Sequence, residues 1–86
     1  MTGARRPGEQ WTQADGVHIE VRGLAPPNPM VLILKLIATL DGSTPVVVHL
    51  DRDPLPLYGE LAQRGWSAQR IEGDAAEVRL RLLKDS

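Results

Sequence analysis

The sequence contains no cysteine. That absence excludes disulfide bonds, thiolate nucleophiles and thiolate-ligated zinc or iron–sulfur centres within this chain. It does not identify a cellular compartment, because cysteine-free proteins occur in oxidising and reducing compartments alike. Phenylalanine is also absent, and the aromatic residues are Trp11, Tyr58 and Trp66, so the predicted core is aliphatic.

The chain has no excess of charge of either sign and no long hydrophobic run. Ten basic and eleven acidic residues give a net charge of −1, which does not favour a nucleic-acid partner, because phosphate backbones demand a basic surface. The longest apolar run, Met30 to Leu34, is far too short to cross a bilayer, and no apolar segment of a signal peptide follows Arg5 and Arg6. We therefore expect no membrane association and a cytoplasmic location.

The apolar sequence that is present suffices for one small domain. The chain has 86 residues, of which 42% are hydrophobic, a length that corresponds to a single core. Residues 1–15 lack periodicity, which predicts a flexible N-terminal arm before a single domain over residues 16–85. Trp11 is unusual in such an arm, and it either docks on the domain or belongs to an interface.

The pattern after residue 16 predicts two strand–helix units and a final hairpin. Residues 17–22 alternate between apolar and polar, as in a half-buried strand, and the nearly all-apolar residues 44–50 predict a central strand. Helices are expected at 29–40 and 55–64, each with a proline at the first helical position and with Asn28 and Asp53 as N-caps. Residues 66–72 and 76–83 predict a hairpin.

This order, β-α-β-α-β-β, predicts an α/β (α+β) two-layer sandwich. Right-handed crossovers place both helices on one face of a mixed four-stranded sheet. The other face is then uncovered, and the outward-pointing strand residues should pave it. These residues are His18, Glu20, Arg22, Arg79 and Arg81.

Two motifs resemble known families. The segment RGLAPPNP at residues 22–29 resembles the loop of TusA/SirA-like sulfur-carrier proteins, Gly-Leu-x-Cys-Pro-x-Pro, whose Cys carries a persulfide. Gly23, Leu24, Pro27 and Pro29 match that loop, but Pro26 stands where the Cys would be. The segment HLDRDPLPLYGELAQRGW is similar instead to a sister group, domain of unknown function 2249, which typically shows a Leu-x-Pro-Pro-x-Pro loop and an acidic-Pro-x-Pro-Leu segment.

The resemblance covers about residues 17 to 84, the whole predicted domain. It implies the two-layer fold of the sulfur carriers. It does not imply their chemistry, because proline cannot hold a persulfide.

Two segments carry groups that could bind a ligand. Residues 22–28 and 49–54 both follow predicted parallel strands, and ligands of open α/β sheets favour the crevice beyond the carboxyl ends of such strands. Proline supplies no N–H donor, and Asp51 and Asp53 place negative charge at the second helix, so the helix N-termini do not favour an anion. The candidate ligand-binding residues are Arg22, His49, Asp51 and Arg52.

A metal site is an alternative at the same edge. His49, Asp51 and Asp53 lie within five residues of one another, and His18 could approach from the neighbouring strand. However, Asp53 is required as a cap, and a single histidine on a central strand is more often a hydrogen-bonded structural residue. We therefore expect no bound metal and no cofactor.

The first predicted helix has more apolar surface than one sheet face can cover. Met30, Ile33, Leu34, Ile37 and Leu40 form its sheet-facing side, while Val31, Leu32 and Leu36 flank the polar stripe at Lys35 and Thr39. Either the second helix covers the flanking residues, or they form an exposed patch for self-association or a partner. The predicted interaction surface comprises Leu24, Pro26, Pro27, Asn28, Pro29, Val31 and Leu32.

The sequence therefore favours a non-enzymatic module that acts through contact with a protein partner or a second copy of itself. A preordered proline loop loses little entropy on binding, and no serine has a His–carboxylate partner at a spacing typical of nucleophilic catalysis. Two alternatives stay open: a small-ligand or metal-binding module, and an accessory component of sulfur transfer whose thiol comes from a partner.

Overall fold

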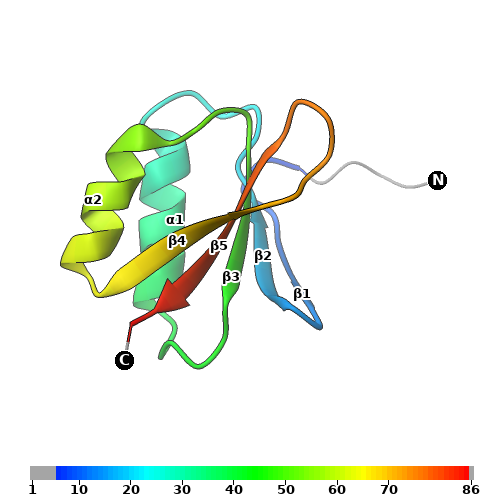
Figure 1. Ribbon diagram of the computed structural model, residues 1–86. Coiled ribbons are helices and arrows are strands. Elements are labelled where there is room, and N and C mark those ends of the chain that lie inside the picture. The colour runs from blue at the N-terminus through cyan, green and yellow to red at the C-terminus, as the bar shows by residue number, and fades with distance from the viewer. Residues whose placement is uncertain (1–5, 86) are drawn as a thin grey trace.

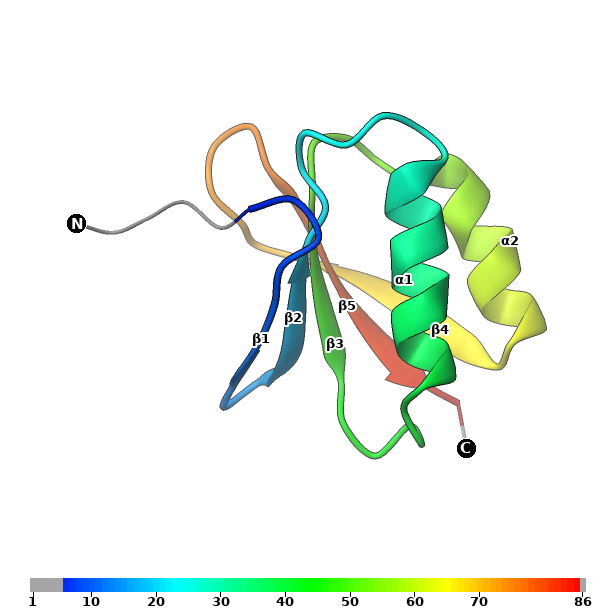
Figure 2. The same cartoon turned by 180° about the vertical axis from the view of Figure 1, so that it is seen from behind.

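The computed structural model describes residues 6–85, which form a mixed sheet covered on one face by helices (Figure 1, Figure 2). Within this range the elements are β1 (Gln10–Gln13), β2 (Gly16–Glu20), α1 (Asn28–Ala38), β3 (Val46–Leu50), α2 (Leu55–Gln63), β4 (Trp66–Ile71) and β5 (Val78–Lys84). The strand order is β1-β2-β3-β5-β4. β2 and β3 are parallel, and the other neighbours are antiparallel. The predicted two-layer α/β sandwich is confirmed, with five strands in place of four.

The additional strand, β1, lies in the segment that was expected to be flexible. Gln10–Gln13 pair antiparallel with β2, and Trp11 stands opposite His18. The turn into β2 needs Gly16, which has a φ of 135° and on which an added Cβ would lie 2.3 Å from the Pro45 carbonyl oxygen. The predicted arm is therefore wrong for residues 10–15, and its residues 1–5 lie outside the described residues.

Both helices start at prolines and without side-chain caps. Asn28 is the first residue of α1, and Pro27 occupies the N-cap position; Pro54 occupies the same position in α2. Asp53 accepts a hydrogen bond from the Tyr58 hydroxyl at 2.5 Å instead of capping the helix. The predicted caps are wrong because the prolines at these starts preset φ and remove N–H groups that a cap would otherwise satisfy.

The core lies between the two helices and the sheet. Its fully buried members come from every layer: Ile19, Ile33, Val46, Val48, Leu57, Leu61, Leu80 and Leu82. Leu36 joins this core, whereas Leu32 is half-buried beside the N-terminal segment, where an added Cβ on Gly8 would lie 3.7 Å from its Cδ1. Val31 alone of the three flanking residues remains exposed, at 40%.

The helices were also examined for length and hydropathy. No helix within residues 6–85 is long and apolar enough to cross a membrane.

Candidate functional site

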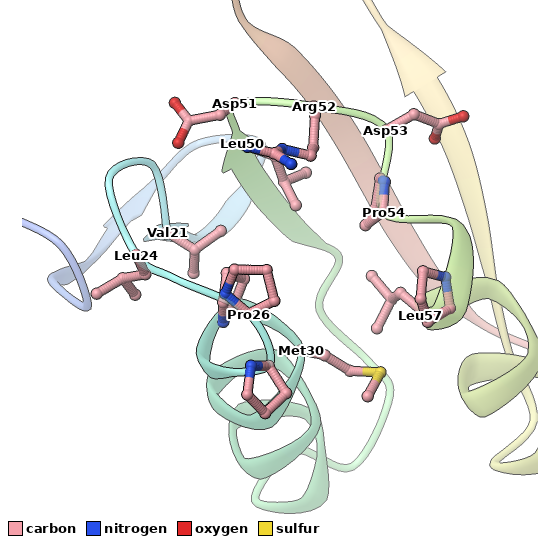
Figure 3. A pocket seen from close by; sticks show the side chains of 13 residues that line it. Val21, Leu24, Pro26, Met30, Leu50, Asp51, Arg52, Asp53, Pro54 and Leu57 are labelled. Carbon is pink, nitrogen blue, oxygen red and sulfur yellow. The ribbon is translucent and has the colours of Figure 1, made fainter.

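An apolar pocket opens at the carboxyl ends of β2 and β3, between the starts of α1 and α2 (Figure 3). Its volume is about 210 Å³, and five of its lining residues are prolines. The other apolar walls are Val21, Leu24, Met30, Leu50 and Leu57. This is the crevice in which open α/β sheets commonly bind their ligands.

The two loops around the pocket are tied to each other at the rim. Gly23 turns the first loop with a φ of 85°, and its N–H donates to a carboxylate oxygen of Asp51 at 2.7 Å. Asp53 is engaged by the Tyr58 hydroxyl, and burial together with this hydrogen bond raises the pKa of Tyr58 to about 12. Arg52 makes no hydrogen bond or ion pair with any of the described residues, so its guanidinium is available at the rim.

The pocket brings together parts of the two residue sets that the sequence singled out. From the interaction surface it takes Leu24 and the loop prolines Pro26, Pro27 and Pro29, and from the ligand-binding set it takes Asp51 and Arg52. The remaining members, Arg22, Asn28, Val31, Leu32 and His49, do not line it. The two predicted surfaces therefore overlap in one pocket, although neither coincides with it.

Arg22 lies beside the acidic side chain of Glu20. Its Nε and Nη2 atoms donate to the two Glu20 carboxylate oxygens at 2.9 and 2.7 Å. This pairing raises the pKa of Arg22. The guanidinium is thus already neutralised by its own strand, which makes it a poor cation for a ligand.

His49 belongs to a second cluster, on the helix-free face of the sheet. His18 Nε2 lies 2.7 Å from Asp15 Oδ1, and His18 Nδ1 lies 2.9 Å from His49 Nε2. His49 Nδ1 lies 2.5 Å from Oε2 of Glu77. We call these four residues the proton chain. His18, His49 and Glu77 are buried, and the Asp15 side chain is 54% exposed.

Trp11 covers the two imidazoles. Its ring centroid lies 5.2 Å from that of His18 and 5.3 Å from that of His49, with interplanar angles of 26° and 27°. The imidazole centroids are themselves 5.1 Å apart. The docking alternative for Trp11 is therefore the correct one, and this stacking explains why residues expected on an uncovered face are buried.

The carboxylates at the two ends of the proton chain are stabilised as anions. Burial alone would raise the pKa of Glu77, but hydrogen bonds from Arg79, a backbone amide and His49 outweigh it and lower the pKa to about 2. The hydrogen bond to His18 lowers the pKa of Asp15. Burial lowers the pKa of His49, against the opposing effect of Glu77.

The proposed metal ligands do not converge. His18 and His49 meet, as expected, but Asp51 and Asp53 lie at the pocket rim and are hydrogen-bonded to Gly23 and Tyr58. Among residues 6–85, no group of three or more potential ligands could hold a metal ion.

Sequence reasoning missed Asp15, Trp11 and Glu77 as partners of the two histidines. Strand alternation carried part of the signal, because Glu77 has the same parity as the outward-facing Arg79. The register of β3 against β5, which places His49 opposite Arg79, was the information still required.

Known proteins were compared with this chain at the level of sequence and structure. No curated protein matches it. Among solved structures it is similar to a SirA-like protein from Desulfitobacterium hafniense, with a TM-score of 0.68 and 21% identity over 80% of this chain and 97% of that chain. Likeness at this identity shows the shared fold alone.

A family profile covers almost the whole fold. The family described as "Uncharacterized conserved protein (DUF2249)" matches residues 18–84, a range that includes the proline loop and the start of α2. This chain, a SirA-like fold without a cysteine, therefore belongs to the DUF2249 family.

Proposed function

We propose that this protein is a cytoplasmic, non-enzymatic binding module whose pocket receives one apolar side chain of a partner protein. The observation that carries the proposal is the proline-walled apolar pocket of about 210 Å³ at the carboxyl edge of β2 and β3. A cavity of roughly 150 Å³ is enough to hold benzene, whereas drug-sized ligands use pockets of about 300–1,000 Å³. The pocket thus suits a leucine or phenylalanine side chain.

The chemistry of the lining supports binding rather than covalent catalysis. The ionisable lining groups are Asp51, Arg52 and Asp53, and both carboxylates already accept hydrogen bonds from the protein. The proline walls are rigid before binding, so little conformational entropy is lost when a group enters.

Arg52 favours a second candidate, a small ligand that joins an apolar body to a carboxylate. Its guanidinium stands at the mouth of the pocket (Figure 3) and has no partner among the described residues. A carboxylate beside the apolar group would gain a charge-assisted hydrogen bond there.

Titration of ¹⁵N-labelled protein with N-acetyl-phenylalaninamide, with N-acetyl-glycinamide as the blank, tests the proposal. We expect amide shifts at Gly23, Leu24 and Leu50 with the aromatic probe and none with the blank. Met30→Trp, whose side chain would fill the pocket, should abolish the shifts, while Leu83→Trp on β5 should leave them unchanged. An aromatic probe that causes no localised shift, or that binds equally well to Met30→Trp, would refute the pocket as a receptor.

A second copy of this chain is the alternative source of the apolar group. Val31 is exposed near the start of α1 and would lie in such a contact. Light scattering across micromolar concentrations distinguishes the cases, because Val31→Asp should return a dimer to a monomer and should not change a protein that is already monomeric.

A further inference from the structure

The proton chain joins parts of the fold that are distant in sequence. Asp15 lies in the turn between β1 and β2, His18 on β2, His49 on β3, and Glu77 just before β5. Its hydrogen bonds therefore connect the β1–β2 hairpin to the centre of the sheet. This cluster lies outside the pocket described above, so its role is independent of the proposed function.

The number of protons in the chain follows from its connectivity. The bonds Asp15–His18, His18–His49 and His49–Glu77 each need one proton, and together they engage all four ring nitrogens. An ionised carboxylate contributes no proton and a neutral imidazole contributes one. Two neutral imidazoles supply only two, so the three bonds require one additional proton on the histidine pair.

Either change in proton number breaks a bond. Removal of the additional proton leaves a ring nitrogen lone pair facing a carboxylate at one end of the chain. Addition of a further one makes two imidazolium ions, whose N–H groups oppose each other across the 2.9 Å contact between His18 and His49. Only the state with one imidazolium satisfies every member of the chain.

The surrounding charges keep the two ends anionic. Glu77 accepts hydrogen bonds from Arg79 at 2.9 Å and from the Asp74 amide at 2.7 Å. Glu20 stands opposite His49 in the β2–β3 register but is neutralised by Arg22. The charged groups that face the pair from its strands and loops are Asp15, Glu20, Arg22, Asp74, Glu77, Arg79 and Arg81.

We propose that one proton shared by His18 and His49 latches the β1–β2 hairpin onto the helix-free face, so that docking of this hairpin depends on pH. The latch acts through the Asp15 end of the chain and through Trp11, which stacks on both rings. Loss of the latch frees β1 and presents the backbone of β2 as a sheet edge. Such an edge can pair with an extended segment of another protein.

Imidazole ¹⁵N spectra count the protons directly. At neutral pH we expect three of the four ring nitrogens to be protonated, with Nε2 of His49 as the acceptor, because burial disfavours the charged form of that ring. Two protonated nitrogens at neutral pH would overturn the proposal.

Asp15→Asn tests the latch at its exposed end. An asparagine amide can donate to His18 Nε2, so two neutral imidazoles complete the chain and the additional proton is no longer needed. The readout is the indole NMR signal of Trp11 between roughly pH 5 and pH 9, with that of buried Trp66 as the internal reference for folding. In the unmodified protein the docked signal should fall at both pH extremes, and in Asp15→Asn the alkaline loss should disappear.

Asp85→Asn removes an exposed carboxylate far from the chain and should behave like the unmodified protein. If Asp15→Asn loses the Trp66 signal, Glu77→Gln serves instead, because its amide can donate to His49 Nδ1 from the other end. A Trp11 signal that is independent of pH in the unmodified protein, or an alkaline loss that survives in the folded asparagine or glutamine variant, would overturn the latch.

Discussion

Strands β2 and β3 build two sites of opposite character from alternating residues. Val21 and Leu50 face the pocket, while His18 and His49 face away from the helices. The pocket walls are apolar and open, whereas every ring nitrogen of the histidine pair has a partner. Apolar surface without a partner can accept a ligand, but a satisfied polar cluster can exchange only protons without losing a bond.

The largest expected effect distinguishes the two sites by stability. Glu77→Ala removes the acceptor for His49, Arg79 and the Asp74 amide and leaves a buried imidazole unpaired. We expect a loss of about 3–5 kcal/mol in the free energy of unfolding, measured by urea denaturation. Glu72→Ala, which alters an exposed carboxylate, should change it by less than about 0.5 kcal/mol. Equal effects of the two substitutions would contradict this account of the proton chain.

The next effect is the dependence of stability on acid. The pKa of Glu77 falls from 4.5 to about 2 on folding, so its contribution is complete above about pH 4.5 and is lost as the pH falls toward 2. A shift of this size corresponds to roughly 3 kcal/mol. Urea denaturation at a series of pH values should show this loss, and Glu77→Gln should flatten the curve in that window. An unchanged curve in the glutamine variant would assign the acid sensitivity to other groups.

A smaller effect is expected from the ring that covers the histidines. Trp11→Ala removes two stacked contacts, each worth about 0.5–1.5 kcal/mol, and admits water to His49. The pKa of His49 should then rise toward its ordinary value, which a chemical-shift titration of the imidazole would record. Thr12→Ala on the same strand is the matched control, and a His49 titration that is identical in the two variants would show that Trp11 does not shield the pair.

The smallest effect on stability is expected at the pocket rim. Arg52→Gln should change the free energy of unfolding by less than about 0.5 kcal/mol, because the side chain has no partner among the described residues. It should weaken binding of N-acetyl-leucine by up to about fivefold, as for an exposed ion pair, and leave binding of N-acetyl-leucinamide unchanged. Equal losses for the acid and the amide would mean that Arg52 does not recognise the carboxylate.

Much of the fold could be predicted because local patterns determine it. The alternation at residues 17–22 and the apolar run before His49 define the two parallel strands. Gly42 and Gly65, which follow the helices, have positive φ angles of 91° and 77°. β1 escaped prediction because a four-residue strand on the sheet edge, with mostly exposed side chains, carries too short a pattern to detect.

The candidate sites were less predictable because they depend on register and not on local sequence. The location of the pocket followed from strand direction, but the burial of the charged face did not. His18 and His49 are separated by 31 residues, and His49 and Glu77 by 28. Their contacts require a one-residue precision in pairing that a single sequence does not supply.

The pocket and the proton chain meet at a single peptide bond. The side chain of Leu50 lines the pocket, that of His49 lies in the chain, and the Val21 N–H donates to the His49 carbonyl oxygen at 3.0 Å. Thermodynamic coupling between two sites is reciprocal. A pocket ligand that alters how tightly the histidine pair holds its proton must therefore bind with an affinity that varies with pH by the same factor. Calorimetry in buffers of different ionisation enthalpy would count the protons exchanged on binding, and a count of zero would mean that the two faces of β2 and β3 act independently.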